Sequence, residues 1–261
     1  MSKPLDAWQS ENYYHLAGEA SLDVSHPGMK ELIILSKGAG SILDLGCGEG
    51  SRLNLLKDKN KKLVGIDISE QGIRMARTQY KDIEFFSGDL EELPFKTQEF
   101  DLVFSAFVLE HLTNPAKVLD EALRVLKKGG KIVLIAPNYG APNRCSPPFK
   151  GSRLQKLLKG FLSDLFSIYS KDRNLNWNKV EPISKKNRYE IDWDTTIEPY
   201  IRSLNDYLSQ KNVRIININS CWIEELKSVK FHQKIFRFLG EKGIYPFVFW
   251  GPHLVLVGEK I

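Results

Sequence analysis

The stretch LDLGCGEG, residues 43–50, decides the fold, because an apolar run changes there into three glycines at alternate positions. The run before it, from Ser41, favours a strand, and residues 51–56 favour a helix. Glycine has no Cβ and accepts positive φ, so a ligand can approach bare backbone at this turn. A helix start adds unpaired N–H groups and a partial positive charge. The stretch therefore predicts a strand, a tight turn and a helix start that together hold a small polar molecule.

The composition is that of an ordinary globular protein. The chain has 261 residues, of which 42% are hydrophobic and 26% charged, so a folded core is expected. Apolar runs stay well short of the roughly 20 residues that cross a bilayer, and the first residues lack the apolar core of a signal peptide. The three cysteines form no CxxC pair, so no disulfide framework and no metal site are expected. The cytoplasm is the expected location.

Strands and helices alternate after the glycine turn. Four apolar runs predict further strands at Lys62–Asp67, Ile83–Phe86, Phe100–Ser105 and Lys131–Ala136. Helices are expected between them, from Glu70 and from Pro115, the second ending at Gly129-Gly130. This order predicts the α/β class, with a doubly wound, Rossmann-like sheet that is mostly parallel. The last strand, residues 253–258, is expected to run antiparallel.

The pattern changes after Pro137, and residues 138–197 read as a helical insertion after the fifth strand. Apolar residues recur at helical spacing from Leu154 to Tyr169, which predicts an amphipathic helix. We expect its apolar face to pack on the sheet. Two other interpretations stay open: a lid over an apolar substrate, and a helix that rests on an anionic membrane through Arg153, Lys156 and Lys159.

Three acids mark the ends of three successive predicted strands. Asp44 precedes the first glycine by two residues, Asp67 ends the second strand, and Asp89 follows the third. A dinucleotide turn reads GxGxxG, whereas the third glycine here comes one residue early. Asp44 would also repel a pyrophosphate, yet it suits a cationic amino group. Asp67 could accept hydrogen bonds from both hydroxyls of a ribose, whether the ligand is S-adenosylmethionine or NAD. The pattern favours S-adenosylmethionine over NAD.

These residues resemble the class I S-adenosylmethionine-dependent methyltransferases. The resemblance runs from about Ser41 to Asn138 and includes LDLGCGEG, VGIDIS, GDLEELPF, FDLVFSAFVLEHL and ALRVLKKGGKIVLIAPN. It is strongest with the small-molecule branch that includes enzymes of ubiquinone and menaquinone biosynthesis. It implies S-adenosylmethionine as cofactor, S-adenosylhomocysteine as product, and one methyltransferase domain over 1–261. Within it we expect cap helices (1–40), a cofactor-binding core (41–137), a substrate-lid insertion (138–197) and the C-terminal part of the sheet (198–261).

The resemblance also implies roles for single residues. Gly46 and Gly48 would pass close to the methionine part of the cofactor, with Cys47 in the same turn and Asp44 orienting it. Asp67 would bind the ribose hydroxyls. Ile68 would pack on the adenine ring, and Asp89 with the Leu90 backbone would form hydrogen bonds to the polar edge of that ring. Ser105 would offer its carbonyl oxygen to the cofactor's amino group, and Tyr13 and Tyr14 would close over the cofactor.

His111 is the candidate catalytic residue, because it follows the fourth strand where the family places a residue that faces the acceptor. Local capping or packing is the alternative interpretation of His111. His15 is a weaker candidate. Asp192 and Asp194 flank Trp193 in the insertion and could bind hydroxyls or an amine, although a surface turn is the favoured interpretation.

The predicted function is transfer of a methyl group, by in-line displacement, to a small-molecule acceptor, and both a lipid-linked and a glycan-like acceptor stay open. A nucleic-acid methyltransferase and a non-catalytic cofactor-binding regulator are the alternatives. Nucleic acid is the less favoured partner, because the fourth strand is followed by Ser105-Ala106-Phe107-Val108 and not by the tetrad of base-amino methylases. Peripheral membrane contact stays open. The oligomeric state and the acceptor atom are not predicted.

Overall fold

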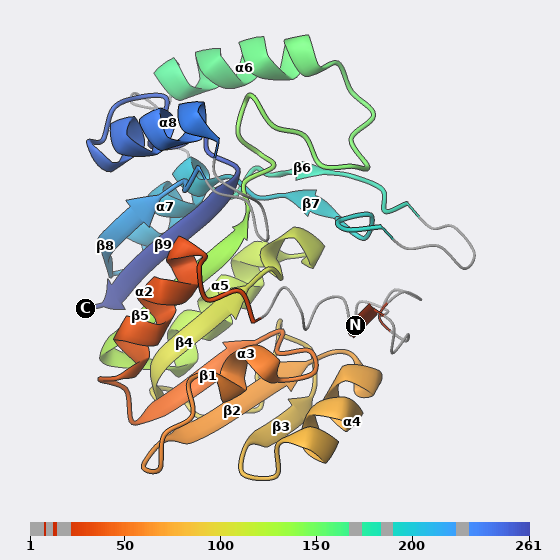
Figure 1. Cartoon of the computed structure of the whole chain (residues 1–261), viewed down its shortest axis with the longest axis vertical. Helices are drawn as coiled ribbons and strands as arrows, with labels where there is room; N and C mark the ends of the chain where they lie inside the picture. Colours follow the sequence, from red (N-terminus) through yellow and green to blue (C-terminus); the bar gives the residue numbers. More distant parts are fainter. Residues whose placement is uncertain (1–7, 9–12, 15–21, 167–173, 184–189, 223–229) are drawn as a thin grey trace.

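A seven-stranded sheet forms the centre of the molecule, with the strand order β3-β2-β1-β4-β5-β9-β8 (Figure 1). The computed structural model describes residues 8, 13–14, 22–166, 174–183, 190–222 and 230–261. The strands of this sheet are β1 (Ser41–Leu45), β2 (Lys62–Asp67), β3 (Glu84–Ser87), β4 (Phe100–Ala106), β5 (Leu126–Pro137), β8 (Val213–Asn219) and β9 (His253–Lys260). A separate pair consists of β6 (Asn178–Lys179) and β7 (Ile197–Glu198).

The strand directions confirm the predicted fold class. Strands β1 to β5 pair in parallel, and the last strand in the chain, β9, runs antiparallel to β5 and to β8, between which it lies. This is a mostly parallel, Rossmann-like sheet. The five parallel strands and the antiparallel last strand were expected from apolar runs, and β2 spans the predicted residues.

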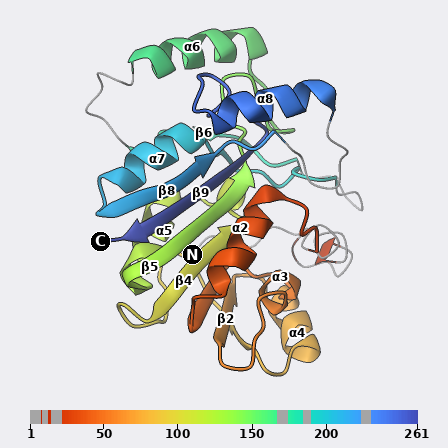
Figure 2. The ribbon, with the colours of Figure 1, turned by 60° about the vertical axis from the view of Figure 1, so that its left-hand side comes forward.

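Helices cover both faces of the sheet and form two hydrophobic clusters. One cluster packs α5 (Pro115–Val125) and α7 (Ile201–Ser209) against the sheet. The other packs α2 (Pro27–Ser36), α3 (Ser51–Asn54) and α4 (Glu70–Gln79) against the opposite face. Two further helices, α6 (Arg153–Phe166) and α8 (Phe231–Glu241), stand apart from these layers (Figure 2).

Local chemistry sets the helix boundaries. The Ser69 hydroxyl accepts from the N–H of Gly72 and caps α4, as its position before the helix predicts. Helix α5 begins with Pro115 at its first turn. The expectation that α5 runs to Gly129-Gly130 is wrong. The helix ends at Val125, because Leu126 is already extended and pairs with Phe100 of β4.

The parallel strands end at one edge of the sheet, and the long connections leave from that edge. The segment with α6 follows the end of β5, and the segment with α8 follows the end of β8. Both helices lie at the same end of the molecule (Figures 1 and 2). Of the predicted cap helices over 1–40, α2 is described, whereas most of residues 1–21 lie outside the described part.

The amphipathic helix is present as α6, but the expected packing of its apolar face on the sheet is wrong. Leu154, Leu158 and Leu162 are 65%, 55% and 51% exposed, and the buried residue of α6 is Asp164. The predicted C-terminal turn, up to Tyr169, lies outside the described residues. In the parts of the chain that the structure describes, no helix combines the length and the apolar character needed to cross a membrane.

Candidate functional site

The glycine turn after β1 has the left-handed backbone that its sequence allows. Gly46, Gly48 and Gly50 have φ angles of 79°, 52° and 85°, in the left-handed region that favours glycine. The turn is fixed to the end of β2, because the N–H groups of Gly46 and Cys47 both donate to the carbonyl oxygen of Ile66. The backbone at this edge is therefore bare and held in place.

Asp67 at the end of β2 joins the turn to α4. Its carboxylate accepts from the N–H of Gly48 at 2.9 Å and from the N–H of Ser69 at 2.8 Å. Burial raises the pKa of Asp67, although these two bonds oppose the shift. Each carboxylate oxygen keeps a second lone pair, and the side chain is half-buried. Asp67 can therefore accept further hydrogen bonds from a ligand with two hydroxyls.

Asp44 and Glu49 place two buried acids beside the turn without full hydrogen-bond partners. Both side chains are buried, and one oxygen of each, Oδ2 of Asp44 and Oε1 of Glu49, has no hydrogen-bond partner in the described structure. Burial raises the pKa of Asp44 to about 8, against the attraction of Arg52. A buried carboxylate without a partner is costly and suits a ligand that brings a cation.

The other predicted cofactor residues lie at the same edge. Ser105 is buried in β4 and Leu90 is buried after β3, whereas Ile68 and Asp89 are half-buried. Asp89 accepts from the N–H of Glu91 at 2.9 Å, which shapes its turn. Their roles toward the cofactor stay predictions. Cys47 is buried, and burial raises the pKa of its thiol.

Tyr14 lies over the glycine turn. A Cβ added at Gly48 would lie 3.4 Å from the Tyr14 ring, and one at Gly72 would lie 3.0 Å from it. Burial and the charge of Asp67 raise the pKa of the Tyr14 phenol, which is 4% exposed. Tyr14 thus lies against the backbone of the turn, and its role over the cofactor stays a prediction. His15 lies outside the described residues.

A second cluster follows β4 and centres on His111, in the short helix η2 (Leu109–His111). Its Nδ1–H donates to the backbone carbonyl of Asp194 at 3.2 Å, and its Nε2 lies 3.8 Å from Oε1 of Glu110. Burial opposes protonation, yet the carboxylates of Asp194 and Glu110 raise the pKa of His111. Burial raises the pKa of Glu110 to about 8. Because Nδ1 carries the proton, the lone pair of neutral His111 is on Nε2.

The expected surface turn around Asp194 is wrong, because this side chain is only 3% exposed. Its carboxylate accepts from Nε1 of Trp8 at 2.8 Å and from the Tyr13 hydroxyl at 3.2 Å. Asp194 therefore joins the amino-terminal segment, the insertion and η2. Sequence reasoning missed Trp8 and Glu110. Glu110 could have been found, since it directly precedes His111.

The two clusters are adjacent. Val108, at the start of the segment that carries His111, lies against Gly46, where an added Cβ would be 2.4 Å from Val108 Cγ2. The charge of His111 also acts on the pKa of Asp67. The histidine thus stands beside the turn that would hold the cofactor. Among the described residues, no group of His, Cys, Asp and Glu side chains could hold a metal ion.

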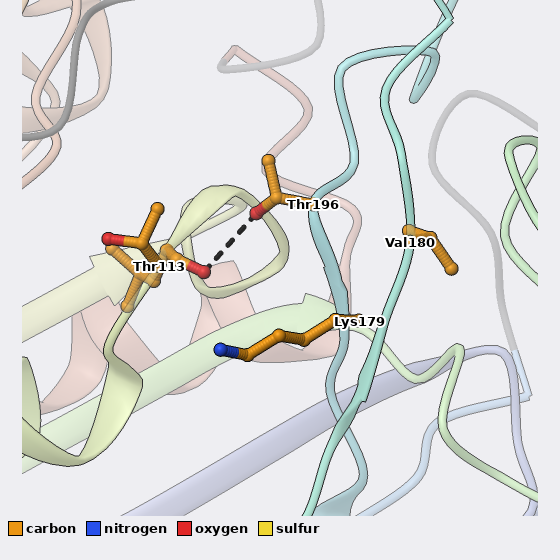
Figure 3. A pocket seen from close by; sticks show the side chains of 5 residues that line it. Thr113, Lys179, Val180 and Thr196 are labelled. Carbon is orange, nitrogen blue, oxygen red and sulfur yellow. Dashed lines mark hydrogen bonds between the residues drawn. The ribbon is translucent and has the colours of Figure 1, made fainter.

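A small pocket of about 140 Å³ adjoins the His111 cluster (Figure 3). Leu112 and Thr113 line it from the segment after η2, and Lys179, Val180 and Thr196 line it from the β6–β7 pair. The Thr196 hydroxyl donates to the Leu112 carbonyl at 3.2 Å, the bond drawn in Figure 3. The pocket offers a hydroxyl, an ammonium and apolar surface near His111.

Comparisons with known proteins agree with this geometry. Residues 43–134 match the family described as "Methyltransferase domain". A Mycolicibacterium smegmatis protein named "Probable S-adenosylmethionine-dependent methyltransferase" is 34% identical over 108 residues, 41% of this chain and 42% of that protein. A Thermotoga maritima demethylmenaquinone methyltransferase is 35% identical over 105 residues, 40% of this chain and 46% of that protein. The chain spans less than half the length of these two relatives.

A solved structure supports the fold over nearly the whole chain. An S-adenosylmethionine-dependent methyltransferase from Mesorhizobium loti aligns with a TM-score of 0.53 at 16% identity and covers 91% of this chain and 100% of that one. The order and directions of the sheet strands agree with this shared fold. Residues 43–134 therefore match the methyltransferase-domain family and are similar to S-adenosylmethionine-dependent methyltransferases.

Proposed function

We propose that the protein transfers a methyl group from S-adenosylmethionine to a small-molecule acceptor. The observation that carries the proposal is the set of acids at the glycine turn: Asp67 with free lone pairs, and Asp44 and Glu49 with unpartnered buried oxygens. The name of the demethylmenaquinone relative supports a small acceptor with an apolar chain. A reducing cytoplasm remains the expected location, consistent with the free cysteines.

The residues present fit the cofactor. Its ammonium and sulfonium groups are cations, and Asp44 and Glu49 are buried acids that lack partners. Its ribose has two hydroxyls, and Asp67 has two oxygens that can each accept another hydrogen bond. The bare backbone of Gly46 and Gly48 admits a close approach. When bound, the cofactor supplies a methyl group that is already activated for transfer.

The chain's own part is to orient the acceptor and to remove its proton. His111 stands next to the glycine turn with Nδ1–H held by the Asp194 carbonyl, so Nε2 is the atom that takes a proton. Asp194 is itself fixed by Trp8 and Tyr13, which gives the histidine a defined position. The acidic neighbours of His111 stabilise the imidazolium that forms. The pocket beside Leu112 and Thr113 would hold part of the acceptor.

Replacing Asp67 by alanine tests the cofactor assignment. The substitution removes the acceptor for two ribose hydroxyls and the anchor of the Gly48 N–H. We expect the affinity for S-adenosylhomocysteine to fall about 10- to 100-fold, the usual cost of hydrogen bonds to a charged group. Isothermal calorimetry measures it. Asp82→Ala, which removes an exposed carboxylate paired with Lys57, is the control and should bind normally. Equal affinities of the two variants would contradict the assignment.

Replacing His111 by glutamine tests the catalytic assignment. We expect the rate of methyl transfer to fall about 10²- to 10⁴-fold, while the affinity for S-adenosylhomocysteine changes little. The wild-type rate should rise with pH through the raised pKa of His111, and the variant should lose this dependence. The assay follows labelled methyl from S-adenosylmethionine into an extract of small molecules.

Three outcomes of these experiments would correct the proposal. Label that appears in nucleic acid and not in small molecules would change the acceptor class. Tight binding of S-adenosylhomocysteine without any transfer by the wild type would favour a non-catalytic regulator. A His111→Gln variant that keeps the wild-type rate would assign this side chain to packing.

A further inference from the structure

Helix α6 exposes the side chains that amphipathic helices usually bury. Leu154, Leu158, Leu162 and Leu165 are 45–65% exposed, and Phe161 and Phe166 are 40% and 66% exposed. Monomeric proteins rarely expose contiguous apolar surface of this kind unless it binds something. The face of α6 that points away from the protein is therefore a candidate interaction surface.

The attachment of α6 to the protein is polar. Asp164 accepts from the Tyr200 hydroxyl at 2.6 Å and from Nε1 of Trp250 at 2.9 Å. The Lys156 ammonium donates to the buried carboxylate of Glu198 at 2.6 Å. These contacts are specific, and they fix which face of the helix is turned inward.

Helix geometry places the apolar stripe opposite this attachment. Lys156, Gly160 and Asp164 are four residues apart and share one face. A Cβ at Gly160 would lie 2.7 Å from Pro142, so that face is in close contact with the chain. At about 100° per residue, Leu158 and Leu162 each lie about 160° from Gly160, the centre of the anchoring face, and so are on the far side of the helix. The polar anchors thus turn the leucines outward.

Helix α8 repeats the arrangement at the same end of the molecule (Figures 1 and 2). None of its residues is buried, and Phe231, Ile235 and Phe238 are 78%, 44% and 57% exposed. Their spacing of four and three residues places them on one face. The segment after α8 contacts α6, because the Phe161 ring lies 6.4 Å from the rings of Tyr245 and Trp250.

Both apolar faces are framed by positive charge. Residues 150–166 carry four Lys/Arg against one acid, and residues 230–244 also carry four against one. Lys159 and Lys234 are exposed, whereas Lys156 and Asp164 are both engaged in the anchor. Apolar side chains beside Lys and Arg are the pattern of helices that lie in the surface of an anionic bilayer.

We propose that α6 and α8 form a docking surface for an anionic lipid bilayer. The leucines and phenylalanines would enter the headgroup region, and the surrounding lysines and arginines would pair with lipid phosphates. A second copy of the chain is the less favoured occupant, because a two-fold contact would bring two positively charged patches together. The inference is independent of the methyl transfer proposed above, since it concerns binding to lipid and not turnover.

Vesicle sedimentation tests the docking surface. The full chain should sediment with vesicles of equal parts phosphatidylglycerol and phosphatidylcholine, and much less with phosphatidylcholine alone. The apolar variant, Leu158→Ser, Leu162→Ser, Phe231→Ser and Phe238→Ser, should lower the partition coefficient more than about tenfold. The charge variant, Lys159→Glu with Lys234→Glu, should lower it about tenfold or more at low salt.

Matched controls lie elsewhere on the surface. Ile34→Ser removes a residue of α2 that is 62% exposed, and Lys128→Glu reverses an exposed charge near the start of β5. Both should partition as the wild type does, and all variants should keep their affinity for S-adenosylhomocysteine if they fold.

Three outcomes would overturn the proposal: binding that is equal on neutral and anionic vesicles, absence of binding to either, or controls that lose binding as the test variants do. Gel filtration tests the alternative that a second copy of the chain occupies the surface. A dimer that the apolar variant converts to a monomer, with no vesicle binding by the wild type, would assign the surface to a second copy.

Discussion

Asparagine in place of Asp44 should weaken cofactor binding and, at alkaline pH, stabilise the ligand-free protein. The Asp44 carboxylate is 1% exposed, one of its oxygens has no partner in the described structure, and burial raises its pKa to about 8. The folded protein therefore bears the cost of a buried charge that a cationic ligand group would offset. Removing the charge removes both the cost and the attraction.

The sign of the pH dependence follows from the raised pKa. Because the folded-state pKa lies above the unfolded value, the stability associated with protonated Asp44 is complete below about pH 4 and is lost as the pH rises through 8. We expect Asp44→Asn to raise the free energy of unfolding by about 1–3 kcal/mol at pH 8.5 and to leave it little changed at pH 4. Urea unfolding of the ligand-free protein at both pH values measures this.

Two comparisons isolate the effect. Asp101 accepts hydrogen bonds from Ser41 and Lys127, which lower its pKa despite burial, so Asp101→Asn should destabilise the protein. Asp44→Asn should bind S-adenosylhomocysteine about 10- to 100-fold more weakly, yet bind 5′-methylthioadenosine, which lacks the amino acid part, as the wild type does. Equal losses for both ligands would place Asp44 away from the ammonium group.

Alanine in place of Gly46 should abolish measurable cofactor binding. The added Cβ would lie 2.4 Å from Val108 Cγ2, and the residue has a φ angle of 79°. The backbone term alone costs about 1–2 kcal/mol, and the overlap must displace either the turn or the segment that leads to His111. Calorimetry with S-adenosylhomocysteine and thermal unfolding measure the two effects.

Gly129→Ala is the matched control for Gly46→Ala. Gly129 has a φ angle of 74°, but a Cβ there would meet nothing within 4 Å. The Gly129→Ala variant should be destabilised by the cost of its positive φ angle, but it should keep its affinity for S-adenosylhomocysteine. Adding Val108→Ala to Gly46→Ala should recover part of the stability, because it removes the methyl groups in the overlap. Full binding by Gly46→Ala alone would show that the turn is not the binding element.

The sheet could be predicted because its residues follow local rules. Buried parallel strands give short apolar runs such as Phe100–Ala106. Glycines mark the turn at Gly46, and Ser69 is a typical N-cap residue that marks the start of a helix. The acids at the strand ends could be predicted to meet, since parallel strands bring their carboxyl ends to one edge. These inferences need only neighbouring residues and the handedness of the crossovers.

Other parts depend on contacts between distant residues. Asp194 is buried because Trp8 and Tyr13, more than 180 positions away, donate to it. The outward direction of α6 depends on Glu198, Tyr200 and Trp250, which accept from or donate to its polar residues. The helical period of α6 shows that it has an apolar face, but not whether that face meets the sheet or the solvent.

The polar anchoring of α6 has a thermodynamic consequence. Heat-capacity change and denaturant sensitivity both grow with the apolar area that an opening step uncovers. Helix α6 already exposes its leucines and is held by Lys156 and Asp164. Its detachment would uncover little further apolar area. Such a step depends mainly on ionic strength, whereas melting of the seven-stranded sheet depends mainly on temperature and urea.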